Sequence, residues 1–129
     1  MIVDKMQIYT WEIVIVYEAT CDNIDYIIKL LKDIKCPITY IKEALNNLEE
    51  CKLNSGLTYS NLKLQKSVIV INKTSSFAEL MNTVSHEYYH LVCHISKTLE
   101  LLDEEEIATL FGDLVMNSYN IIISELTNS

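Results

Sequence analysis

The spacing of apolar residues changes along the chain, and each spacing predicts a different element. Residues 6–19 form a mostly continuous apolar stretch rich in Ile, Val and Tyr, which is typical of a strand buried on at least one face. From Asp22 onward the apolar residues are separated by three and four positions, which predicts a helix. Pro37 interrupts this pattern and fits the first turn of a second helix, which we expect to end at residues 54–56.

Two short strands and two long helices are predicted in the rest of the chain. Residues 57–61 and 66–72 have the composition of strands, and their short separation predicts a hairpin. Ser76 and Asp103 are each followed three residues later by a glutamate, and such capping boxes predict a helix to about Leu99 and a final helix toward Ser124. The order of elements predicts one α+β domain over residues 1–129.

The composition excludes several classes of partner. Half of the residues are hydrophobic, and there are only two glycines and one proline, which indicates a core dense in regular elements. Ten basic and eighteen acidic residues give a net charge of −8, which opposes binding to nucleic acid or to an anionic membrane surface. We therefore expect no nucleic-acid partner and no membrane partner.

The cysteines and the first twenty residues both bear on the cellular compartment. Cys21, Cys36, Cys51 and Cys93 form no CxxC pair, and we expect them to be reduced and partly buried. The first twenty residues show neither a basic leader nor a small-residue cleavage site. Both features predict a cytoplasmic protein.

All three histidines of the chain lie in the helix predicted from Ser76. Residues 85–90 contain the pattern HExxH. Positions four apart on a helix are separated by one turn and about 40° round the axis, so His86 and His90 can bind one ion. Glu87 lies between them in sequence as a candidate general base, which is the arrangement that zinc-dependent hydrolysis requires.

The third histidine, His94, shares the polar face of the same predicted helix. A solvated helix face accounts for this polarity, but it does not account for three histidines at positions i, i+4 and i+8. One straight helix is poorly suited to place three imidazoles around a tetrahedral ion. We therefore expect His94 to contact substrate or solvent rather than the metal.

A third metal ligand is needed, because hydrolytic zinc sites use three protein ligands and leave the fourth position to water. The acidic run 103–106 is the best source, although a helix dipole also favours acidic residues in a first turn. Glu106 is placed to close the capping box. Glu105 is followed by a stripe of small side chains that ends at Gly112 and predicts close packing against the histidine helix. Glu105 is the expected ligand, and Glu104 is the alternative.

These residues together resemble a known group of enzymes. HExxH on one helix with a glutamate on the next resembles the gluzincin type of zinc metallopeptidase, whose ligand glutamate commonly opens an ExxA pattern, here residues 105–108. The stretch 56–112 is similar to small metallopeptidase-type proteins of bacteriophages and related bacterial mobile elements. The resemblance implies a minimal zincin-like fold, zinc bound by His86, His90 and Glu105, and Glu87 as the catalytic base.

The resemblance also shapes the expected function. Thr109 stands where some gluzincins carry an acidic partner for a histidine, and Asp113 is the candidate for that role. We expect hydrolysis of a peptide or protein substrate, held in extended form by an edge strand at residues 66–72. Two other classes remain open. One is a non-catalytic zinc-containing binding or regulatory module, and the other is an interaction protein with surface histidines and no metal.

Overall fold

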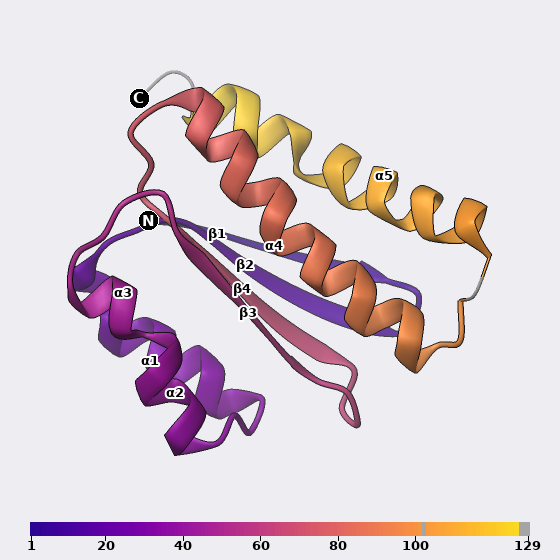
Figure 1. Cartoon of the computed structure of the whole chain (residues 1–129), viewed down its shortest axis with the longest axis horizontal. Coiled ribbons are helices and arrows are strands. Elements are labelled where there is room, and N and C mark those ends of the chain that lie inside the picture. The colour runs from indigo at the N-terminus through magenta and orange to yellow at the C-terminus, as the bar shows by residue number, and fades with distance from the viewer. Residues whose placement is uncertain (102, 127–129) are drawn as a thin grey trace.

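A four-stranded mixed sheet with helices on both faces forms the fold (Figure 1). The computed structural model describes residues 1–101 and 103–126, with side chains described as far as residue 123. The expected α+β class is confirmed. The elements in chain order are β1 (Ile2–Ile8), β2 (Trp11–Ala19), η1 (Cys21–Asn23), α1 (Ile24–Asp33), α2 (Ile38–Ala44), α3 (Asn46–Glu49), β3 (Gly56–Asn61), β4 (Lys66–Asn72), α4 (Phe77–Thr98), α5 (Glu104–Asn120) and η2 (Ile121–Leu126).

The strands lie in the order β1-β2-β4-β3, with a parallel pair at the centre. β1 is antiparallel to β2, β2 is parallel to β4, and β4 is antiparallel to β3. The predicted hairpin of the last two strands is confirmed. The single strand predicted over residues 6–19 is wrong, because the chain turns back at Tyr9 and Thr10. Tyr9 adopts a positive φ of 55° there, and no glycine or asparagine marks this turn in the sequence.

Side chains of the two central strands alternate between two hydrophobic cores. One set, including Ile15 and Ile69, packs with α4 and α5. The other set, including Val16 and Val70, packs with α1, α2 and α3 on the opposite face (Figure 1). The continuous apolar runs of β2 and β4 are therefore explained by burial on both faces of the sheet.

The first helical region is more broken than the sequence pattern predicts. A short 3₁₀ turn precedes α1, and the side chain of Thr20 caps it by accepting a hydrogen bond from the Asp22 amide. Pro37 is the residue before α2 rather than part of its first turn. The predicted second helix is divided at Leu45 into α2 and α3. Gly56 opens β3 instead of ending a helix.

A disulfide joins Cys21 to Cys51 across this helical region, with a sequence separation of 30 and an S–S distance of 2.02 Å. The prediction of four reduced cysteines is therefore wrong for this pair. Cys36 and Cys93 are free. The spacing of Cys21 and Cys51 matches no sequence motif. The two residues come together because the chain after α3 returns to lie beside η1. Disulfides are typical of oxidising compartments, so the cysteines no longer favour the cytoplasm.

Within the described part of the chain, every helix is too short or too polar to span a bilayer.

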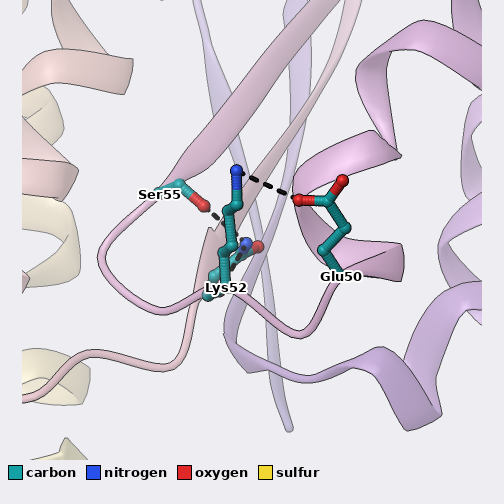
Figure 2. Close-up of polar contacts among 4 residues, drawn as sticks. Glu50, Lys52 and Ser55 are labelled. Carbon is teal, nitrogen blue, oxygen red and sulfur yellow. Dashed lines mark hydrogen bonds and ion pairs between the residues drawn. The ribbon is translucent and has the colours of Figure 1, made fainter.

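The loop ahead of β3 is tied to the end of β4 by one buried side chain. The Asn72 amide donates hydrogen bonds to the Lys52 carbonyl at 3.3 Å and to the Ser55 hydroxyl at 2.8 Å. Figure 2 shows Ser55 beside Lys52, whose ammonium pairs with the Glu50 carboxylate at 3.0 Å. These contacts fix the point at which β3 begins, and so the place of Gly56.

The two long helices begin where their caps were predicted. The Ser76 hydroxyl accepts a hydrogen bond from the Glu79 amide at 3.1 Å, and α4 runs to Thr98. Asp103 caps α5, but its carboxylate accepts from the Glu105 amide at 2.7 Å rather than from Glu106. The final helix continues from α5 into the π-helical turn η2, as far as residue 126.

Candidate metal centre

The two motif histidines converge on one point beside α4. The Nε2 atoms of His86 and His90 are 3.2 Å apart, and the rings meet at 77°. Two imidazoles bound to tetrahedral zinc, with bonds of about 2.0–2.1 Å, have ligand atoms about 3.3–3.4 Å apart. The distance between the two nitrogens therefore fits one edge of a zinc tetrahedron. Both side chains are exposed, so the edge is accessible from solvent.

Glu87 lies on the side of α4 that faces the edge of the sheet, and only 5% of the residue is exposed. The Thr58 hydroxyl lies 2.8 Å from Oε1 of this carboxylate and donates a hydrogen bond to it. The backbone of β3 at Gly56 also lies close to the Glu87 side chain. A Cβ placed on Gly56 would lie 3.0 Å from Glu87 Cγ and 2.6 Å from the Val70 carbonyl oxygen. Glu87 thus occupies space that only a glycine leaves open.

The strand beside this glutamate is β3, which is an edge of the sheet. The expectation that Lys66–Asn72 is the edge strand is wrong, because β4 lies between β2 and β3. A hairpin predicted from sequence does not reveal which of its strands pairs with a distant one. The position expected for the substrate-holding strand is therefore taken by β3.

Side chains of β3 alternate between the two layers of helices. Thr58 and Ser60 point toward α4, where they contact Glu87 and His94. Tyr59 points to the other face and packs against Tyr40 of α2, with ring centroids 5.1 Å apart. Thr58 and Ser60 are functional candidates that the sequence reasoning missed. Their i, i+2 spacing in a predicted strand was the available signal, but it did not identify their partners.

His94 is held by a hydrogen bond from the sheet. Its Nδ1 lies 2.6 Å from the Ser60 hydroxyl, which in turn lies 2.6 Å from the hydroxyl of Ser67. Burial lowers the pKa of His94, and the nearby charges of His90 and Lys97 lower it further. The ring is therefore biased toward its neutral form.

A pocket of about 540 Å³ opens between α4, β3 and α2. The three histidines and Glu87 line it, together with Thr58 and Ser60. A second pocket, of about 300 Å³, shares Gly56, His86 and Glu87 with the first. Together they form a groove, which we call the β3 groove, with Glu87 at its middle. The remaining residues of the first pocket are Tyr40, Ala44, Leu57, Thr58, Tyr59, Ser60, His90 and His94. Those of the second are Asn47, Asn54, Ser55, Asn82 and Thr83.

The packing expected around Gly112 is wrong. A Cβ placed on this glycine would meet nothing within 4 Å, and the small-residue stripe of α5 is exposed to solvent. α5 instead turns Leu110 and Leu114 into the core, on the side of the helix away from that stripe. The small-residue stripe therefore does not pack Glu105 against the histidine helix.

The third metal ligand remains a prediction. Glu104, Glu105 and Glu106 are exposed in the first turn of α5, and Asp113 is exposed further along it. Among the described residues, no group of three or more His, Cys, Asp or Glu side chains is placed to hold a metal ion. The histidine pair is therefore the part of the predicted site that the fold brings together.

Comparisons with protein-family models, with curated proteins and with solved structures find no match to this chain. The fold and the site define a mixed α+β domain that carries two convergent histidines beside a buried glutamate. The metallopeptidase class is therefore a hypothesis that rests on the HExxH helix and its surroundings.

Proposed function

We propose that the protein is a zinc-dependent hydrolase of peptide bonds. The observation that carries this proposal is the 3.2 Å separation of the His86 and His90 Nε2 atoms, in a pocket that the buried Glu87 also lines. His86 and His90 would hold the ion, and the gluzincin resemblance assigns the third position to Glu105. Zinc in such a site supplies a Lewis acid that acidifies water and polarises a carbonyl group.

Glu87 is the proposed general base. The Thr58 hydroxyl holds Oε1, and Oε2 has no hydrogen-bond partner among the described residues. This leaves one carboxylate oxygen to accept the proton of an attacking water and to deliver it to the leaving amine. Thr58 restrains the carboxylate in the orientation that this transfer needs.

The β3 groove is the proposed substrate site. An extended peptide can add to the free edge of β3, because an edge strand presents unpaired backbone groups. The Tyr40 hydroxyl lies 3.4 Å from the Thr58 carbonyl oxygen and would give way to the incoming strand. Residues on either side of the cleaved bond would then meet different surroundings, with Tyr40 and Tyr59 in one pocket and Asn82 and Thr83 in the other.

A non-catalytic zinc-containing module is the second candidate. The lack of a three-ligand group among the described residues favours it, because two histidines alone hold zinc less completely than a hydrolytic site does. Such a module would keep the ion and the groove but turn over no peptide.

The test combines metal analysis with one matched pair of variants. Protein purified without a His-tag should hold one zinc per chain, measured by inductively coupled plasma mass spectrometry. Glu87→Gln should keep the zinc and lose peptide hydrolysis. Glu79→Gln, the same change on the same helix, should keep both. Zinc well below one per chain that added zinc does not restore would refute the proposal, whereas zinc without cleavage of a broad peptide library would support the non-catalytic module.

The third ligand is tested by single alanine variants of the acidic run. Glu105→Ala should weaken zinc binding, while Glu106→Ala should leave it unchanged. Unchanged zinc affinity in Glu105→Ala, measured by competition with a chelator, would remove Glu105 from the site. A loss in Glu104→Ala instead would assign the ligand to Glu104.

A further inference from the structure

A line of hydrogen bonds runs from the buried core to the β3 groove. It starts at the indole of Trp11 on β2, which is fully buried, and passes to Ser67 on β4, which is 1% exposed. The indole Nε1 donates to the Ser67 hydroxyl at 2.8 Å. The line continues at 2.6 Å to Ser60 on β3 and at 2.6 Å to Nδ1 of His94 on α4. Four elements of the fold thus meet in one polar chain.

The direction of the protons in this line is fixed at its buried end. An indole N–H can only donate, so the Ser67 oxygen must accept from Trp11. The Ser67 hydroxyl then donates its hydrogen bond to Ser60. Among the described residues, His94 Nδ1 is the acceptor that remains for the Ser60 hydroxyl. The reverse direction would leave the Ser67 proton buried without an acceptor among the described residues, which is costly.

This direction determines the tautomer of the neutral His94 ring. Nδ1 accepts a hydrogen bond, so the ring proton resides on Nε2. His94 lines the β3 groove, and its Nε2 has no hydrogen-bond partner among the described residues. A neutral imidazole binds a metal through its unprotonated nitrogen, and Ser60 occupies that nitrogen here. The line therefore gives His94 a different role from that of His86 and His90.

We propose that His94 is a substrate-binding residue, whose Nε2–H donates a hydrogen bond to a backbone carbonyl of a peptide lying along β3. Ser60 and Ser67 are positioning residues, which hold the ring in place and set its tautomer. The peptide as ligand rests on the proposed function. The tautomer rests only on the hydrogen bonds that link Trp11, Ser67, Ser60 and His94.

The tautomer can be tested in zinc-free protein by long-range proton–nitrogen NMR of ¹⁵N-labelled histidine side chains. At a pH where the ring is neutral, His94 should show a protonated Nε2 and an unprotonated Nδ1. Ser60→Ala should relax this preference, and Ser85→Ala, at an exposed serine of the same helix, should not change it. A protonated Nδ1 in the wild type, or an unaltered spectrum in Ser60→Ala, would overturn the assignment.

The substrate contact is tested in the zinc-loaded protein with two probes, an alanine tripeptide hydroxamate and acetohydroxamate. His94→Ala should keep the wild-type zinc content and should bind the tripeptide hydroxamate about threefold to tenfold more weakly, which is the loss expected for one hydrogen bond. His94→Gln, which restores an N–H donor, should recover part of that loss. Acetohydroxamate, which has no peptide backbone, should bind all three proteins equally.

The two proposals fail in different ways. Equal tripeptide binding by wild type and His94→Ala, or an equal loss for both probes, would overturn the substrate contact. Loss of zinc in His94→Ala would make the residue a ligand and would also overturn it. A wild type that binds no zinc would refute the proposed function and the peptide contact with it, while the NMR spectrum of the zinc-free protein would still decide the tautomer.

Discussion

Replacing Gly56 with alanine tests how closely β3 approaches the histidine helix. The added Cβ would lie 2.6 Å from the Val70 carbonyl oxygen and 3.0 Å from Glu87 Cγ. The first contact is with backbone of β4, which cannot move without shifting the sheet. The second is with the proposed catalytic base, so the substitution should disturb stability and site geometry together.

The size of the effect follows from these contacts. Overpacking of a tight site costs about 1–3 kcal/mol. Alanine also reduces the freedom of the unfolded chain, which returns about 0.4–1 kcal/mol. The free energy of unfolding should therefore fall by about 1–2 kcal/mol. For a chain of 129 residues this corresponds to a melting temperature lower by about 4–7 °C.

Gly112→Ala is the matched control, because it is the same substitution at the only other glycine of the chain. A Cβ there meets nothing within 4 Å, and the residue lies inside α5. Alanine is favoured over glycine in a helix interior by about 1 kcal/mol, so the melting temperature should rise by about 3–4 °C. The measurement is thermal unfolding by far-ultraviolet circular dichroism, repeated with urea as the denaturant. A Gly56→Ala protein as stable as wild type, or more stable, would refute the close packing around Gly56. A lower melting temperature for Gly112→Ala would contradict the open space at that glycine.

Two further predictions concern the disulfide and the buried tyrosines. Replacing Cys21 and Cys51 with serine should lower the free energy of unfolding by about 3–4 kcal/mol, the loop-entropy value for a separation of 30 residues, whereas Cys93→Ser should change it little. Equal urea midpoints for the double variant and wild type would contradict this. Burial raises the pKa of Tyr17 and Tyr88 above the ordinary tyrosine value, and their contact raises the pKa of Tyr17 further. The folded pKa values exceed the unfolded value of about 10, so this stabilisation is complete below about pH 10 and is lost as pH rises above it. The urea midpoint of the wild type should fall as the pH rises above about 10, and the midpoint of the Tyr17→Phe variant should fall less steeply. Equal slopes for the two proteins would contradict the assignment of this effect to Tyr17.

The helices and the motif could be predicted because their signals are local. Ser76 and Asp103 cap the helices that they were expected to cap, and the 3.6-residue period of α4 placed Tyr88 in the core and the histidines on the opposite face. The pairing of strands is not local. β1 was not predicted as a separate strand, because the turn at Tyr9 contains no glycine. The position of β4 at the centre of the sheet depends on its parallel contact with β2.

The surroundings of the site were missed for the same reason. Thr58, Ser60 and Gly56 have no motif, and their roles follow only from the way α4 lies against the edge of the sheet. The disulfide could not be predicted either, because Cys21 and Cys51 are brought together only by the path of the whole helical region. The expectation for Gly112 failed because a glycine can lie in a helix without a packing contact, and period alone does not distinguish the two cases.

The arrangement of the sheet has a consequence for how fast the chain folds. Each hairpin forms from contacts close in sequence, but the central pair joins positions such as Ile15 and Ile69, and long loops close slowly. The bond between Cys21 and Cys51 shortens that path, because it links the residues just after β2 to those just before β3. The oxidised chain therefore has a much smaller search before the two hairpins meet. Denatured protein that keeps this disulfide should therefore refold faster than the reduced protein.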